Sequence, residues 1–152
     1  MIQISIQRDA DALDLPLPSY ATAGAAGLDL YAVLETRLTL APGQRALVST
    51  GIRLALPEGF EGQVRPRSGL AWRQGLTLLN SPGTIDSDYR GTIKVIVINL
   101  GAEPVSLVRG DRIAQIVVGP VSRVVWTEVD SLPEKERGEE RRGEGGFGST
   151  GK

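Results

Sequence analysis

The sequence predicts an all-β domain of the sandwich, barrel or jelly-roll type. Apolar and polar residues alternate with a period of two in many short segments, as expected of half-buried antiparallel strands. These segments are residues 2–6, 38–40, 51–56, 105–108, 113–118 and 124–129. Clusters of turn-forming residues separate the segments, at residues 41–43, 57–59, 81–83, 99–101 and 109–111. Many short strands joined by tight turns are typical of these architectures.

Only one helix is predicted, over residues 69–74. Ser68 is suited to cap its start and Gly75 to end it. Composition changes beyond the last predicted strand, because residues 134–144 are almost all Glu, Lys, Arg or Gly. Such a segment cannot bury enough apolar area to offset its ordering entropy. The sequence therefore predicts a β domain over residues 1–130, followed by a linker and a flexible glycine-rich C-terminal tail over residues 131–152.

Composition limits the chemistry that the chain can perform. Its 152 residues include no histidine and no cysteine, so acid–base catalysis must use Asp, Glu, Tyr or Lys, and thiolate chemistry is excluded. A formal net charge of −1 argues against a protein that coats nucleic acid. The N-terminus lacks signal-peptide features, and no apolar run approaches the roughly 18 residues of a spanning helix. We expect a soluble intracellular protein without nucleic-acid or membrane partners.

Residues 80–91 are the most informative segment. They place Asn80, Asp86, Asp88, Tyr89 and Arg90 in one turn-rich loop. Apolar, strand-like runs lie on both sides of this loop. A loop held between rigid strands is a common location for a binding or catalytic site.

Other polar segments each have an ordinary surface interpretation as well as a functional one. Arg67, Ser68 and Gly69 combine a guanidinium fork, a hydroxyl and a predicted helix start, which together suit a phosphate. Gln115 is a polar residue within an apolar strand. Asp29 lies between two leucines and should therefore face the opposite side of its strand.

The glycine-rich end of the chain also suits a phosphate. It contains the hydroxyl residues Ser149 and Thr150 among glycines whose N–H groups could wrap an anion. Phe147 offers a ring face on which a base could stack. The simpler interpretation is a disordered tail, although such a tail can become ordered on a ligand.

Taken in order, five segments closely resemble the five motifs of trimeric dUTPases, the dUTP pyrophosphatases. These segments are residues 26–30, 66–71, 83–91, 109–115 and 142–151. The resemblance extends from about residue 15 to residue 151. It implies a jelly-roll-like fold, hydrolysis of dUTP to dUMP and pyrophosphate, and a cytoplasmic homotrimer with active sites shared between subunits. Such an activity limits uracil incorporation into DNA and supplies dUMP for thymidylate synthesis.

The resemblance also implies roles for individual residues. Asp86 is expected to be the general base that activates a water against the α-phosphorus. Asn80 is expected to pair with uracil, and Tyr89 to stack under the deoxyribose. Mg²⁺ held mainly by the phosphates would contact Asp29 through water. The expected phosphate contacts are Arg67, Ser68, Gly69 and Gln115, and the tail is expected to act as a lid, with Arg142, Ser149 and Thr150 over the phosphates and Phe147 over the uracil.

Two other functions remain open at this point. A dCTP deaminase of the same fold usually has a Pro-Gly-Trp/Phe run after its motif aspartate, where this chain has Ser87, Asp88 and Tyr89. A non-catalytic nucleotide-binding module is the second alternative, but an intact Asp86 and an intact tail count against it. Release of pyrophosphate from dUTP would discriminate among the three functions.

Overall fold

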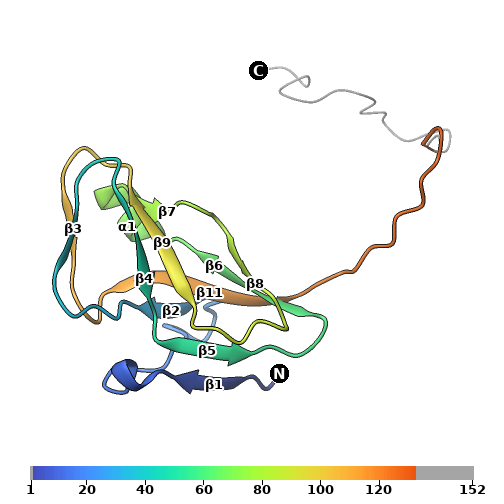
Figure 1. Ribbon diagram of the computed structural model, residues 1–152, viewed down its shortest axis with the longest axis horizontal. Coiled ribbons are helices and arrows are strands. Elements are labelled where there is room, and N and C mark those ends of the chain that lie inside the picture. The colour runs from blue at the N-terminus through green and yellow to red at the C-terminus, as the bar shows by residue number, and fades with distance from the viewer. Residues whose placement is uncertain (1, 133–152) are drawn as a thin grey trace.

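The computed structural model describes residues 2–132, which form eleven strands, one α-helix and one short 3₁₀ turn (Figure 1). The strands are β1 (Ser5–Arg8), β2 (Leu28–Tyr31), β3 (Leu38–Leu40), β4 (Arg45–Ser49), β5 (Ile52–Ala55), β6 (Phe60–Arg65), β7 (Leu76–Leu78), β8 (Gly83–Ile85), β9 (Lys94–Asn99), β10 (Val105–Leu107) and β11 (Arg112–Pro120). The helix is α1 (Ser68–Gln74), and the 3₁₀ turn is η1 (Ala10–Ala12). Neither of them is long and apolar enough to cross a membrane.

The strands pair only in antiparallel fashion within the described part of the chain. The largest sheet has four strands in the order β2-β11-β6-β8, and a second has three in the order β4-β9-β7. Two further pairs, β1-β5 and β10-β3, complete the domain. Figure 1 shows β9 crossing over the sheet that contains β11 and β6. The predicted all-β, jelly-roll-like fold with one short helix is confirmed.

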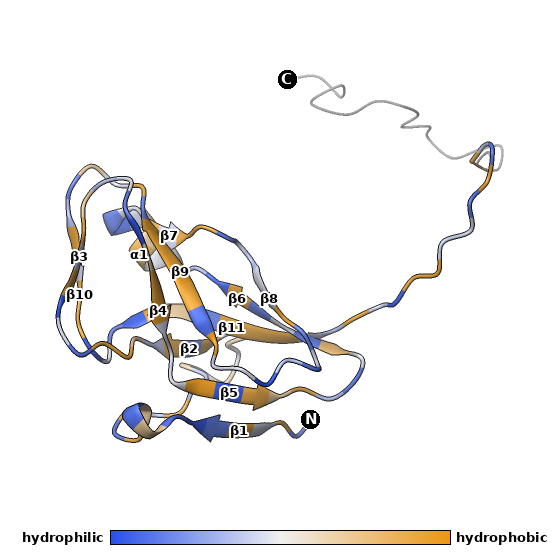
Figure 2. Cartoon of the chain, viewed as in Figure 1, coloured by the Kyte–Doolittle hydropathy of each residue, from blue (hydrophilic) through white to orange (hydrophobic). Residues whose placement is uncertain are grey.

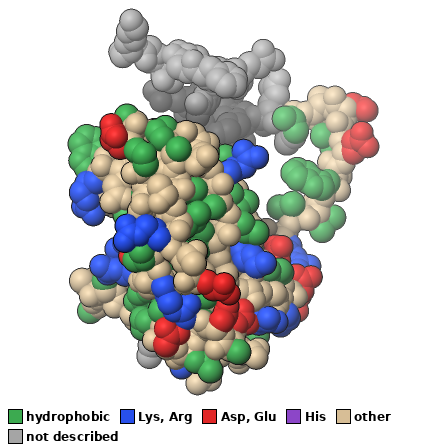
Figure 3. Space-filling model, turned by 60° about the vertical axis from the view of Figure 1, so that its left-hand side comes forward, with side chains coloured by type: hydrophobic (Ala, Val, Ile, Leu, Met, Phe, Trp, Pro, Cys, Tyr) green, Lys and Arg blue, Asp and Glu red, His purple; other side chains and the backbone are tan. Residues whose placement is uncertain are grey.

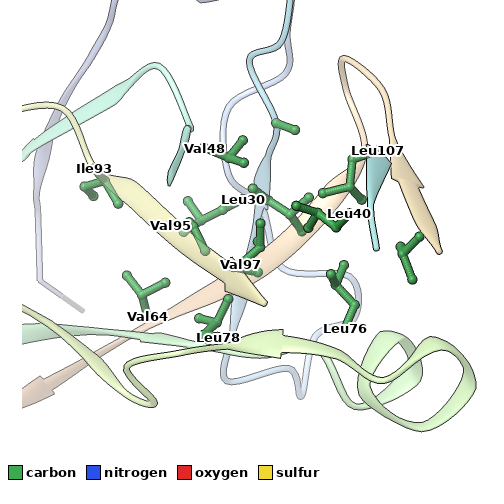
Figure 4. Packing of buried hydrophobic residues seen from close by; sticks show 14 of the residues in the cluster. Leu30, Leu40, Val48, Val64, Leu76, Leu78, Ile93, Val95, Val97 and Leu107 are labelled. Atoms are coloured by element: carbon green, nitrogen blue, oxygen red, sulfur yellow. The ribbon is translucent and has the colours of Figure 1, made fainter. Parts of the chain in front are cut away.

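The core lies between the two larger sheets. Val95 and Val97 on β9 point towards Leu30 on β2, with Val64 of β6 and Leu78 of β7 beside them (Figure 4). Each of these side chains is less than 5% exposed. Figure 2 shows β9 and β11 as largely apolar strands. Complete burial of such a side chain contributes about 1.5–3 kcal/mol, so this layer is the main source of stability.

Most predicted strands are present, but one is wrong. Residues 124–129 form no strand, and the side chains of Val125 and Trp126 are 95% and 89% exposed. A strand needs a neighbouring backbone to satisfy its polar groups, and within residues 2–132 this segment is paired with none. The sequence did not predict β4, β6 or β8. Strand β6 carries polar residues on one face and Gly62 on the other, which weakens its alternation.

The helix begins differently from the prediction. Ser68 is its first residue rather than its cap, and the cap position is taken by Arg67, which makes no capping hydrogen bond through its side chain. Gly75 ends the helix in the left-handed region, with φ of 68°, as predicted. A Cβ atom on Gly75 would lie 2.3 Å from the backbone nitrogen of Gly101. The turn η1 was not predicted, and its Ala12 is buried.

Gly75→Ala should destabilise the protein far more than Gly43→Ala. Both glycines have positive φ, but a Cβ at Gly43 would meet nothing within 4 Å. Gly43→Ala should therefore cost only the left-handed strain, about 1–2 kcal/mol. Gly75→Ala adds a backbone clash with Gly101 and should cost at least about 3 kcal/mol. Urea unfolding measures both values, and equal losses would show that the contact with Gly101 is relaxed.

Candidate functional site

Two polar clusters are built on the four-stranded sheet, and the first lies on its outer face. Asp29 on β2 is paired with Gln115 on β11, which in turn is paired with Arg65 on β6. Strand alternation turns Asp29 away from its neighbour Leu30, which is fully buried. The prediction that Asp29 faces the side opposite to its leucine neighbours is thus confirmed.

Asp29 is the centre of the first cluster, because both of its carboxylate oxygens have an arginine partner. Arg67 Nε lies 3.0 Å from Oδ1, and Arg112 Nη1 lies 3.1 Å from Oδ2. Arg67 also donates a 3.1 Å hydrogen bond to the carbonyl of Arg112. Gln115 Nε2 donates to the carbonyl of Pro66 at 2.9 Å. We call Asp29, Arg67, Arg112 and Gln115 the arginine cluster. Its two guanidinium groups share one carboxylate, so it keeps positive charge suited to an anion.

Two side chains lie close against the backbone of glycines near the arginine cluster. A Cβ on Gly27 would lie 2.2 Å from Gln115 Oε1, so only a glycine leaves room for this amide. At Gly69 the corresponding position is 3.0 Å from Nη2 of Arg73, whose guanidinium therefore lies over the start of α1. A cleft of about 240 Å³ opens beside Arg67 and Arg112. The structure thus brings three predicted segments, far apart in sequence, together in the arginine cluster.

The second cluster is the loop of residues 80–91, which we call the Asp86 loop. It begins where the chain leaves β7 in one sheet and enters β8 in the other. The amide nitrogen of Asn80 lies 3.2 Å from where a Cβ of Gly83 would be, so the Asn80 side chain folds over Gly83. Ser81 Oγ donates to the carbonyl of Leu78 at 2.9 Å. Part of the predicted loop is therefore a short strand, β8, which is paired with β6.

The Asp86 loop is fastened by its own hydrogen bonds. The Asp86 carbonyl accepts a bond from the backbone N–H of Tyr89 at 3.2 Å. Arg90 Nη1 donates to the carbonyls of Ser87 and Tyr89, at 2.6 and 2.8 Å. The carboxylate of Asp86 is left exposed between two clefts of about 620 and 200 Å³. A fixed backbone that presents a free carboxylate is suited to general-base catalysis.

Tyr89 shares the smaller of these clefts with Asp86. Thr84, Ile85, Ile93 and Lys94 are its remaining lining residues. Tyr89 is 43% exposed, and its hydroxyl donates to the carbonyl of Thr92 at 3.0 Å. One wall of this cleft is therefore an aromatic face, and its opening carries a carboxylate.

The two clusters lie on opposite sides of β6. On this strand Arg65 is paired with Gln115, whereas Gly62 is paired with Ile85, the residue before Asp86. Arg65 and Gly62 are about 10 Å apart along β6, because each residue of a strand adds about 3.3 Å. Strands β11 and β8, on either side of β6, are about 10 Å apart. Asp86 therefore lies roughly 14 Å or more from Gln115. Within one chain, Asp86 and Gln115 are therefore too far apart to contact the same phosphate.

Sequence reasoning missed three residues of these clusters. Arg112 was given no role of its own, yet it binds Asp29. Arg73 and Lys94 were not considered, although both lie beside predicted site residues. Arg73 follows Gly69 by one helical turn, which is a signal the sequence did contain. The predicted lid residues lie outside the described residues, and these are Arg142, Phe147, Ser149 and Thr150.

Comparison with known proteins identifies a family relationship. A family model described as dUTPase matches residues 14–151. A deoxyuridine 5'-triphosphate nucleotidohydrolase from Wolbachia pipientis subsp. Culex pipiens is 53% identical over 99% of this chain and 97% of its own length. The protein of that name from Methylocella silvestris is 55% identical over 99% of this chain and 92% of its own length.

Solved structures share the fold at lower identity. A mutant dUTPase of Staphylococcus bacteriophage 80alpha, determined with dUpNHpp, is similar with a TM-score of 0.85 and 21% identity, over 99% of each chain. A mutant dUTPase of phage phi11 of S. aureus, described with a structural Mg(II) ion, has a TM-score of 0.75 and 19% identity. That match covers 86% of this chain and 99% of the phage chain.

Gly27→Ala should displace the Gln115 side chain while leaving the fold intact. The atom that would be hit is the end of a flexible side chain, which can rotate away. Its hydrogen bond to Pro66 would be lost, at a cost of about 1 kcal/mol. A crystal structure and a thermal melt of the variant test this together. An unmoved Gln115 amide, or a collapse of the melting temperature, would contradict the expectation.

Proposed function

The chain belongs to the dUTPase family, and we propose that it hydrolyses dUTP to dUMP and pyrophosphate. The observation that carries this proposal is the exposed carboxylate of Asp86, held beside Tyr89 in one cleft on a self-fastened loop. This reaction removes dUTP before its uracil can enter DNA and supplies dUMP for thymidylate synthesis. We further propose that the enzyme acts in the cytoplasm, since its substrate is a free nucleotide.

Asp86 is proposed as the general base. It accepts a proton from a water molecule while the water oxygen attacks the α-phosphorus. The bond from the α-phosphorus to the bridging oxygen breaks, and pyrophosphate leaves. An ordinary aspartate is a weak base, so its effect depends on position. The hydrogen bonds of Arg90 to Ser87 and Tyr89 support this assignment, because they fix the loop backbone around Asp86.

Asn80 and Tyr89 are proposed to select the nucleoside. The Asn80 amide can donate to O4 of uracil and accept from N3–H, whereas cytosine presents the inverted pattern. Tyr89 offers a ring face to the deoxyribose, where a ribose 2'-OH would clash. The small cleft lined by Asp86 and Tyr89, about 200 Å³, supports a pocket for a single nucleoside.

The phosphates are proposed to bind at the arginine cluster, through its Arg67 and Gln115 together with the neighbouring Ser68 and Gly69. Arg67 then exchanges Asp29 for a phosphate oxygen. Within residues 2–132 no group of three or more acidic side chains is placed to hold a metal ion. We therefore propose that Mg²⁺ is held mainly by the phosphates, with Asp29 as its carboxylate contact through water. Bound there, Mg²⁺ would neutralise charge on the triphosphate.

A homotrimer with shared active sites is proposed, because a complete site needs the two clusters from different chains. The separation of Asp86 from Gln115 across β6 supports this arrangement. The exposed apolar side chains of Val125, Trp126 and Leu132 support it too, because contact with another subunit would remove them from water. Beyond β11 this segment stands away from the body, with hydrophobic side chains along it (Figure 3). The tail residues Arg142, Phe147, Ser149 and Thr150 are proposed to close over the bound nucleotide.

Product analysis with dUTP, dTTP, dCTP and UTP tests the proposed reaction. We expect dUMP and pyrophosphate from dUTP, with much slower turnover of the other three nucleotides. Ammonia and dUTP released from dCTP would identify a deaminase instead. Tight binding of dUTP without product would indicate a non-catalytic module.

Asp86→Asn should retain dUTP binding but lower turnover by about 10²–10⁴-fold, the usual contribution of a positioned general base. Asp88→Asn is the matched control, because Asp88 is another exposed carboxylate of the same loop. It should retain nearly full turnover. Steady-state kinetics and calorimetric binding of a non-hydrolysable dUTP analogue distinguish the two effects. Normal turnover in Asp86→Asn would remove this residue from the mechanism.

A further inference from the structure

We propose that Asp9 and Thr92 act as a pair of positioning residues that fix the Tyr89 ring and so set the discrimination between deoxyribose and ribose. This inference rests on the proposed function, in which Tyr89 faces the sugar. Asp9 lies at the end of the N-terminal strand, far from the Asp86 loop in sequence.

A continuous chain of hydrogen bonds connects Asp9 to Tyr89. The hydroxyl of Tyr89 donates to the carbonyl of Thr92 at 3.0 Å. The Thr92 hydroxyl donates to Asp9 Oδ2 at 2.6 Å, across 83 residues of sequence. Arg53 Nε completes the chain by donating to Asp9 Oδ1, also at 2.6 Å. The Thr92 carbonyl binds the Tyr89 hydroxyl, and the Thr92 side chain is held in turn by Asp9.

Asp9 is charged, and a backbone hydrogen bond holds it in place. The Thr92 hydroxyl, together with Arg53 and Lys94, holds the pKa of Asp9 below its ordinary value against the opposing effect of burial. Asp9 is therefore a carboxylate at neutral pH, and charge-assisted hydrogen bonds are about twice as strong as neutral ones. The Asp9 backbone N–H donates to the carbonyl of Gly51 at 2.8 Å. Gly51 directly precedes strand β5, so the position of Asp9 is tied to this strand.

The Tyr89 ring needs this support because packing covers only part of it. A Cβ on Gly91 would lie 2.4 Å from the Tyr89 hydroxyl oxygen and 2.6 Å from Cζ, so the ring lies directly on the Gly91 backbone. The residue is nevertheless 43% exposed and lines the small cleft, so part of the ring has no protein contact. The bond to the Thr92 carbonyl fixes the tip of the ring. A ring that excludes a hydroxyl by contact loses this ability when it can tilt.

Thr92→Val and Thr92→Ser form the matched pair that tests the proposal. Valine keeps the shape of threonine but removes the hydroxyl, whereas serine keeps the hydroxyl. We measure kcat/KM for dUTP and for UTP. The ratio of the two should fall about three- to tenfold in Thr92→Val, the effect of one lost hydrogen bond. It should stay within about twofold of wild type in Thr92→Ser. Asp9→Ala should reproduce the effect of Thr92→Val.

Asp14→Ala is the control for a general loss of surface ion pairs. Asp14 forms an ion pair with Arg109, outside the chain of bonds to Tyr89. This variant should leave the dUTP/UTP ratio unchanged. In a Tyr89→Ala background, Thr92→Val should have no further effect on the ratio, because the ring that it positions is absent. An NMR titration of Asp9 should show a higher carboxyl pKa in Thr92→Val than in wild type.

Several results would overturn the inference. They are an unchanged ratio in folded Thr92→Val and Asp9→Ala, an equal change in Asp14→Ala, or an unchanged pKa of Asp9 in Thr92→Val. If Tyr89→Ala itself leaves the ratio unchanged while dUTP is still hydrolysed, the positioning role is wrong but the hydrolysis stands. If wild-type protein releases no pyrophosphate from dUTP, the proposed function itself is wrong.

Discussion

The pairing of β6 with β11 on one side and β8 on the other is the constraint on which the rest of the site depends. The pairing of Arg65 with Gln115, and of Gln115 with Asp29, fixes where the arginine cluster lies along the sheet. The pairing of Gly62 with Ile85 fixes the position of Asp86, the next residue. A slip of one residue would turn these polar side chains into the core, because strand side chains alternate with a period of two. Buried neighbours such as Val64 and Ile116 oppose such a slip. The core and the site are therefore fixed by the same hydrogen bonds.

Sequence reasoning worked where local pattern decides the structure. Strands β3, β9 and β11 have clear apolar patterns, and Gly75 ends its helix as predicted. It failed where tertiary contacts decide. Residues 124–129 carry a strand-like pattern but pair with no strand in the described chain. Strand β6 has a weak pattern but is held by two neighbours.

The site shows the same division. The residue types in the Asp86 loop predicted a site there, and alternation alone predicted which way Asp29 faces. No sequence pattern could show that Arg112 binds Asp29, or that Thr92 holds the Tyr89 ring. These contacts join segments that only the fold brings together. The separation of the two clusters also needed the strand order, which sequence periodicity does not give.

The proposed active site combines Asp86 of one chain with the arginine cluster of another. Co-assembly of Asp86→Asn chains with Arg67→Ala chains tests this arrangement, because each variant alone should be nearly inactive. When the two variants are mixed in equal amounts and assemble at random into cyclic trimers, about a quarter of the sites would combine an intact Asp86 with an intact Arg67. We therefore predict recovery of about a quarter of wild-type turnover in the mixture. Turnover no higher than the mean of the two separate variants would show that each site is built within one chain.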